Sequence, residues 1–186
     1  MNIFFLDINP QIAAQNHCDR HVVKMILEST QLLWTAQHIL AGEDGLRLDD
    51  TDPHPYKPTH RNHPCAIWTR ATLGNYRWLC SLASALVVEY HYRYPHGRAH
   101  ACEPHIRWLI ANPPAPLLRA AQPMTMPALA MPDAYKIHPS PTACYKAYYL
   151  GQKYEQGLLT YTGRSPPHWA AVVASWRSVK CRGTRH

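Results

Sequence analysis

The sequence predicts an all-α fold, a single compact helical domain with a long proline-rich ordered loop. Two observations support this prediction. Apolar residues recur at helical spacing over most of the 186-residue chain. Asn-Pro and His-Pro pairs stand directly before two of these stretches, where a capping residue followed by proline starts a helix. A chain of this length suits one domain, so we treat residues 1–186 as a single unit with little or no sheet.

The first helix is predicted to begin at Asn9-Pro10 and to run to about residue 40, with room for one break. Residues 3–6, which precede it, are expected to form either a short strand or an extended segment. Residues 42–58 are predicted to be a loop, acidic at first and then rich in proline and histidine.

The second helix is predicted to open at His63-Pro64 and to continue to about Tyr94, where its apolar periodicity ends. Gly74-Asn75 is the expected position of a kink or division. A shorter helix is predicted over residues 104–111.

Residues 112–141 contain eight prolines, which excludes regular helix or a central strand. The segment also carries leucines and methionines, so we expect an ordered loop that packs over the domain. Helices over residues 142–159 and 170–179 follow, and residues 177–186 form a basic tail.

The charge of the chain favours a polyanionic partner. Lysine and arginine number 19 against 12 acidic residues, a net charge of +7, and no acidic residue follows Glu155. Nucleic acid is expected before membrane, since no basic amphipathic helix or lipidation signal is present. The six cysteines lack a paired Cys-x-x-Cys spacing, and neither a signal peptide nor a transmembrane run is apparent. These features predict a cytoplasmic protein with reduced thiols, and they leave the oligomeric state open.

His17, His21, Lys24 and Glu28 follow one another at spacings of four, three and four. On one helix these side chains would lie within about 60° of each other. Two imidazoles, an amine and a carboxylate can exchange protons near neutral pH and form a covalent imine. The alternative is the wet face of an amphipathic helix. The richness in histidine and the apolar residues further along the same sector disfavour that alternative.

A second group lies at residues 59–64. His63 or Asn62 would cap the helix that Pro64 opens, and its free amides, with Arg61 and Arg70, would suit a phosphate group. Ordinary capping with surface charge is the alternative interpretation.

Metal sites are less well supported by the sequence, and the main prediction is no cofactor. His17, His21 and Glu28 could present ligands for a divalent metal, which we keep as an alternative. The histidines and the cysteine between residues 91 and 105 match no standard zinc spacing.

Aromatic and basic residues mix over residues 89–94, 145–149 and 161–169, a composition that suits an exposed or flipped nucleotide. The order of all these features resembles the phage-type pyrimidine-dimer DNA glycosylases and their small phage and bacterial relatives. The resemblance covers roughly residues 1–100. It is carried by Ile12-Ala13-Ala14-Gln15-Asn16-His17 with Arg20 and Glu28, and by Asn62-His63-Pro64 with Trp68, Asn75, Trp78, Glu89, Tyr90 and Arg93.

The resemblance implies a compact all-α enzyme that flips a nucleotide out of DNA and cuts its glycosidic bond through an imine. Glu28 would match the catalytic glutamate of the family, and Arg20 a residue that contacts phosphate. The nucleophile of the family is the α-amine of the chain after removal of methionine. Asn2 disfavours that removal, so the amine of Met1 would serve, or Lys24 would, if burial and its histidine neighbours held it as a free amine.

The sequence therefore predicts an enzyme that processes DNA or nucleotides, first of all a DNA glycosylase or lyase acting on a damaged or modified base, in a bacterial host cell if phage-encoded. The expected catalytic residues are Glu28, Lys24, His21, His17 and Met1. The expected nucleic-acid-binding residues are Arg20, Arg61, Asn62, His63, Arg70 and Arg77. Two alternatives stay open: a metal-dependent modifying enzyme using His17, His21 and Glu28, and a non-enzymatic phage DNA-binding protein.

Overall fold

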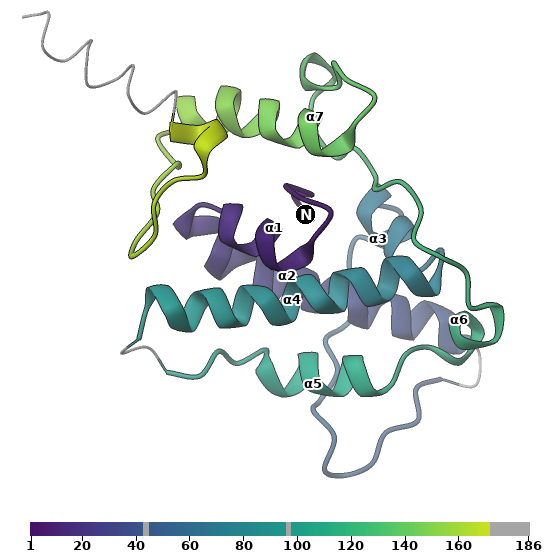
Figure 1. Cartoon of the computed structure of the whole chain (residues 1–186). Helices are drawn as coiled ribbons and strands as arrows, with labels where there is room; N and C mark the ends of the chain where they lie inside the picture. Colours follow the sequence, from purple (N-terminus) through teal and green to yellow (C-terminus); the bar gives the residue numbers. More distant parts are fainter. Residues whose placement is uncertain (43–44, 96–97, 172–186) are drawn as a thin grey trace, which may run out of the picture.

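Two long helices, α2 (Asp19–Ala41) and α4 (Leu73–Arg93), pack against each other at the centre of the fold. The computed structural model describes residues 1–42, 45–95 and 98–171. Helix α1 (Pro10–Asn16) also packs on α4, and α5 (Glu103–Ala111) covers the side of α4 away from the N-terminus, as Figure 1 shows. The described ranges contain helices and no strand, which confirms the all-α prediction.

Both long predicted helices are divided. The expected break in the first falls at His17 and Cys18, whose extended backbone separates α1 from α2. In the second, α3 (Pro64–Thr69) ends before residues 70–72, and the side chain of Thr72 caps α4. The predicted division at Gly74-Asn75 is therefore a few residues too late.

Gly74 has a different role, in the first turn of α4. Its amide donates to the carbonyl of Gln122 at 3.0 Å, and a Cβ at this position would lie 2.1 Å from the backbone nitrogen of Met124. Only glycine allows the backbone of the proline-rich segment to pass this close to the helix.

The proline-rich segment contains one short α-helix, α6 (Ala115–Ala120), and a 3-10 turn, η2 (Asp133–Tyr135). The prediction that residues 112–141 hold no regular helix is wrong for α6. Pro116 stands in the first turn, where the missing amide costs no hydrogen bond, so the helix can form. The expected packing is observed, since Leu117 and Met131 are buried.

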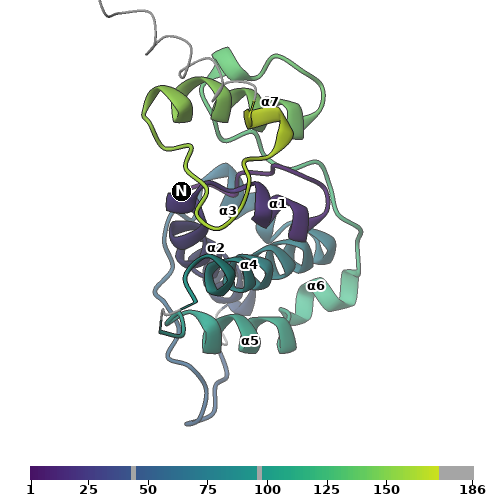
Figure 2. The same ribbon diagram turned by 60° about the vertical axis from the view of Figure 1, so that its left-hand side comes forward.

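The C-terminal part forms a separate layer. Helix α7 (Pro141–Tyr148) continues directly into a π-helix, η3 (Tyr149–Lys153), and helical structure ends near residue 155, short of the predicted residue 159. Figures 1 and 2 show this layer above the N-terminus, with α2 and α4 below it. Residues 168–171 form a helical turn, while most of the predicted helix over 170–179 and the tail over 177–186 lie outside the described residues.

Residues 3–6 run through the space between these two layers. They form neither helix nor the strand that was one alternative, and they are almost fully buried. The other alternative, an extended segment, is interrupted at Phe4, whose φ is 51°. The side-chain oxygen of Asn2 accepts hydrogen bonds from the amides of Ile3 and Phe4, and its amide nitrogen donates to the carbonyl of Ala130 at 2.6 Å. The start of the chain is therefore held in one place by burial and by hydrogen bonds.

No helix of the described residues is long and apolar enough to cross a membrane. The cysteines that the structure describes are buried free thiols, namely Cys18, Cys65, Cys80, Cys102 and Cys144.

Candidate functional site

Glu28 and the start of the chain meet at one point. The Glu28 side chain lies on α2 and is 9% exposed. One carboxylate oxygen accepts a hydrogen bond from the backbone amide of Asn2 at 2.8 Å, and the other lies 3.1 Å from Nζ of Lys24. Covalent geometry keeps the nitrogen of Met1 within about 4 Å of the Asn2 nitrogen. Glu28, Lys24 and Met1, three of the predicted catalytic residues, are thus brought together.

The two amines differ in their surroundings. Lys24 is 59% exposed and forms an ion pair with Glu28, the environment of an ordinary surface lysine. The burial that the sequence hypothesis required for a lysine nucleophile is absent. Met1 is half-buried and directly precedes the buried segment of residues 2–6. The geometry favours the α-amine over Lys24.

Helix α3 brings His63 and Cys65 to the same corner. Nδ1 of His63 accepts the amide hydrogen of Cys65 at 3.2 Å, which caps the helix and leaves Nε2 as the protonated nitrogen of the neutral ring. The pKa of His63 is lowered by burial and next by the positive amine of Met1, while Glu28 opposes this. Burial raises the pKa of the Cys65 thiol to about 12. The charges of the Met1 amine and of the Glu28 carboxylate therefore act on both His63 and Cys65.

The phosphate site predicted at residues 59–64 is not available as expected, because several of its groups are bonded within the protein. Helix α3 has only six residues, and its first free amide is already taken by His63. Arg70 donates from its guanidinium to the carbonyl of Arg61 at 2.8 Å, and Asn62 is exposed. His63 lies close enough to Met1 and Glu28 for their charges to act on its ring.

His21 is buried between the two layers. Its ring stacks on Phe4 at a centroid distance of 4.3 Å, and its Nδ1 lies 2.6 Å from the hydroxyl of Tyr149. Burial lowers the pKa of His21 to about 3, and the nearby positive charges add to this effect. The ring is neutral at physiological pH.

His17 does not belong to the row that the sequence predicted. It stands in the break between α1 and α2, so its side chain leaves the helix face that carries Lys24 and Glu28. The ring is fully buried, Nδ1 lies 2.6 Å from the carbonyl of Ala13, and burial lowers its pKa to about 4. A continuous row and a wet face are both wrong for His17.

The described part of the chain contains no group of three histidine, cysteine or acidic side chains placed to hold a metal. His17, His21 and Glu28 therefore do not converge as a ligand set. One nitrogen of each histidine is also engaged by Ala13 or Tyr149.

The two buried histidines predict acid sensitivity. In the unfolded chain they bind protons near pH 6.5, whereas in the folded protein they stay neutral until about pH 4 and pH 3. Stability is therefore lost as the pH falls below 6.5, by about 2 kcal/mol for each group at pH 5. We expect urea unfolding to show this loss between pH 7 and pH 5.

Replacement of His21 by Gln should reduce that difference, because Gln does not titrate. His54→Gln, at an exposed position, should leave it unchanged. Equal differences for both variants and the wild type would contradict the assignment.

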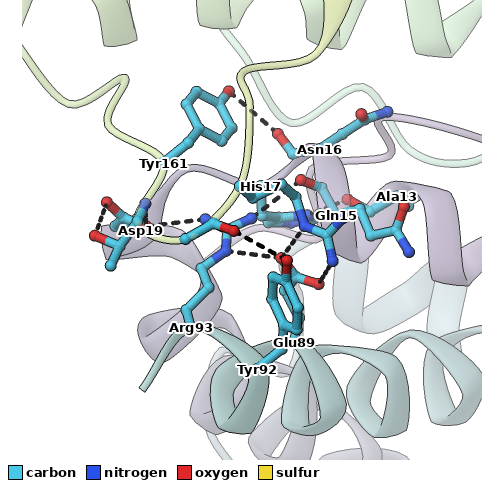
Figure 3. A network of polar contacts seen from close by, with 12 residues as sticks. Ala13, Gln15, Asn16, His17, Asp19, Glu89, Tyr92, Arg93 and Tyr161 are labelled. Carbon is cyan, nitrogen blue, oxygen red and sulfur yellow. Dashed lines mark hydrogen bonds and ion pairs between the residues drawn. The ribbon is translucent and has the colours of Figure 1, made fainter. Parts of the chain in front are cut away.

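A second polar group, buried and close to His17, is shown in Figure 3. Glu89 accepts hydrogen bonds from Nε of Arg93 at 2.7 Å and, through both oxygens, from Arg164 at 2.6 and 2.7 Å. Arg93 also donates to Asp19 at 3.0 Å and to the carbonyl of Gln15 at 3.0 Å. We call Asp19, Glu89, Arg93 and Arg164 the charge network. Glu89 and Arg93 are buried, while Asp19 and Arg164 are partly exposed.

This network fastens the segment of residues 160–164 to the ends of α1, α2 and α4. Asp19 accepts hydrogen bonds from the amide and hydroxyl of Thr162. Burial raises the pKa of Asp19, but its bonds from Thr162 and Arg93 outweigh that and hold the pKa below its usual value. The hydroxyl of Tyr161 donates to the carbonyl of Asn16 at 3.3 Å (Figure 3). The network has the geometry of a structural clamp.

The remaining predicted DNA contacts are scattered. Arg20 is exposed in the first turn of α2, close to His21. Arg77 instead lines a groove of about 490 Å³ between α1, α4 and α5, whose lining does not include Glu28. The structure does not bring Arg77 to the corner formed by Met1, Glu28 and His63.

The roles of several residues of the site could not be predicted from the sequence. Asn2, Phe4, Tyr149 and Lys153 reach the site only through contacts between distant parts of the chain. Glu89 and Arg93, four residues apart near the end of α4, show the spacing of a helical ion pair, which could have been recognised.

Comparison of the chain with models of protein families, with curated proteins and with solved structures found no match. The function proposed below therefore rests on the geometry of the site.

Proposed function

We propose that this protein is a DNA-processing enzyme, a glycosylase or lyase that acts on a damaged or modified base with the α-amine of Met1 as nucleophile. One observation carries the proposal: the 2.8 Å hydrogen bond from the amide of Asn2 to Glu28, which holds the chain terminus against a nearly buried carboxylate. The first residues of a domain are usually poorly ordered unless they are tied down, and here residues 2–6 are buried.

The chemistry follows from an amine and a carboxylate side by side. The neutral amine attacks C1′ of the nucleotide, the glycosidic bond breaks, and the base leaves with the bonding electron pair and takes up a proton. Loss of the amine proton and opening of the C1′–O4′ bond then give an imine. Glu28 can accept the proton from the amine and stabilise the positive charge that develops on the sugar.

His63 fits this step as a hydrogen-bond donor. Its capping bond orients the ring and leaves Nε2–H as the donor, and its lowered pKa keeps the ring neutral beside the Met1 amine. His21 has a positioning role: it stacks on Phe4 and shares a hydrogen bond with Tyr149, which holds the start of the chain between the two layers.

The test is borohydride trapping. We expect the purified protein to form a reduced covalent adduct with abasic duplex DNA, and mass spectrometry of the digest to place the adduct on the Met1 peptide. Reductive methylation of the protein amines beforehand should abolish the adduct, whereas Lys24→Arg should retain it. Absence of any adduct and of strand cleavage would exclude the lyase and leave the non-enzymatic DNA-binding alternative.

A further inference from the structure

The proline-rich segment contacts the start of the chain on its way from α6 to α7, the first helix of the C-terminal layer (Figure 1). Asn2 is buried, and its side-chain nitrogen Nδ2 donates to the carbonyl of Ala130 at 2.6 Å. This hydrogen bond joins two residues that are 128 positions apart and that lie outside helices and strands. The position of Asn2 is therefore coupled to that of Ala130.

A buried tyrosine fixes this part of the proline-rich segment. The hydroxyl of Tyr145, on α7, donates to the carbonyl of Ala128 at 2.7 Å and accepts the amide hydrogen of Ala130 at 3.2 Å. It thereby satisfies two backbone groups that no helix or strand pairs. Because the Tyr145 side chain is fully buried, its hydroxyl gives residues 128–130 a defined place against α7.

The other half of the Asn2 side chain shapes the start of the chain itself. Oδ1 accepts hydrogen bonds from the amides of Ile3 at 2.8 Å and Phe4 at 3.0 Å. Phe4 has a φ of 51°, which is unfavourable for a residue with a Cβ. Such a backbone conformation persists only where the surroundings impose it. The bonds to Asn2 and the stacking of Phe4 on His21 supply that constraint.

We infer that Asn2 is the residue that positions the Met1 amine, and that Tyr145 acts through Ala130 to keep Asn2 in place. The inference rests on the proposed function, in which this amine is the nucleophile. The backbone amide of Asn2 donates to Glu28 at 2.8 Å, so a side chain that fixes this peptide also fixes the nitrogen one residue before it. The proline-rich segment thus serves the reaction through a backbone carbonyl.

Borohydride trapping on abasic DNA under single-turnover conditions measures the effect on the reaction. Asn2→Leu removes the side-chain hydrogen bonds and keeps a branched side chain, whereas a small residue here would favour removal of Met1. This variant should react about 100-fold more slowly, the cost of a displacement of about 1 Å. Its Kd for duplex DNA that carries an unreactive abasic analogue should not change, since the Asn2 side chain is buried.

Tyr145→Phe removes only the hydroxyl and should slow trapping by a smaller factor. The double variant should be no slower than Asn2→Leu, because both changes break the same connection through Ala130. Rates that multiply in the double variant, or a wild-type rate for Asn2→Leu, would overturn the inference.

Asn75→Leu is the matched control. Asn75 is fully buried on α4 and clamps the same proline-rich segment at another point. Its Oδ1 accepts the amide hydrogen of Thr125 at 2.8 Å, and its Nδ2 donates to the hydroxyl of Thr125 at 2.9 Å. The variant should lower the Tm and keep the wild-type trapping rate. Slowing equal to that of Asn2→Leu would mean general loosening and not positioning.

Amide hydrogen exchange tests the positioning without catalysis. In Tyr145→Phe, Ile3 and Phe4 keep their acceptor on Asn2, but the hold on Asn2 through Ala130 is weakened. Their amides should therefore exchange faster than in the wild type, and at the wild-type rate in Asn75→Leu. Faster exchange in Tyr145→Phe together with a wild-type protein that forms no adduct supports the positioning and removes the lyase. Unchanged exchange overturns the inference even if the wild type forms the adduct.

Discussion

Replacement of Glu28 by Gln is expected to slow adduct formation with abasic DNA by about 100- to 10,000-fold, the range for loss of a general acid or base. The amide oxygen of Gln can still accept the hydrogen bond that Asn2 donates at 2.8 Å. The start of the chain should therefore stay in place while the negative charge is lost. Single-turnover trapping with borohydride measures the rate.

Two comparisons make this result specific. Glu103→Gln removes a carboxylate that also binds a histidine, His91 at 2.8 Å, but lies on α5, and it should keep the wild-type rate. The Glu28→Gln protein should bind a duplex that contains a tetrahydrofuran abasic analogue, which cannot form an imine, with the same Kd as the wild-type protein. A wild-type rate for Glu28→Gln would remove the carboxylate from the mechanism.

Replacement of Arg93 by Met is expected to give the largest loss of stability. The Arg93 side chain has no exposed surface and neutralises both Asp19 and Glu89. Removing one partner of a buried charge group costs about 3–5 kcal/mol, because here Asp19 loses its ion pair with Arg93 and Glu89 keeps only its bonds from Arg164. For a chain of this size the loss corresponds to a fall in Tm of about 6–20 °C.

Arg107→Met is the matched control. Arg107 is 78% exposed and lies 4.0 Å from Glu103, so its loss should cost at most about 1 kcal/mol. The double variant with Glu89→Gln should be less damaging than the sum of the single changes, since each removes part of the charge that the other leaves unpaired. A Tm for Arg93→Met equal to that of Arg107→Met would show that the network is not a clamp.

The start sites of helices could be predicted because their signals are local. Asn9 accepts hydrogen bonds from the first amides of α1, and His63 caps α3, as the Asn-Pro and His-Pro pairs indicated. The number of prolines led to a wrong prediction for α6. Pro116 stands in the first turn of that helix, where a proline is tolerated. It also placed the division of the second helix at Gly74 instead of at the capping residue Thr72.

The candidate site was predicted only in part. Lys24 and Glu28 follow from helical spacing, and the structure pairs them at 3.1 Å. The helical row did not extend to His17. The extended backbone of His17 and Cys18 breaks the helix there, and the His17 side chain is buried in the core. The closeness of Met1 to Glu28 followed from the resemblance and not from the pattern of residues.

The sequence by itself determined the helical class, the main cap positions and the basic charge, since each depends on residues within a few positions of one another. Only the tertiary structure decided which groups became neutral, paired or unpaired. Tyr149, which bonds His21, lies 128 residues away from it along the chain, and Arg164, which bonds Glu89, lies 75 residues away. Burial and opposite charge act through space, so the chemical state of such groups is set by the packing of the layers and not by the order of residues.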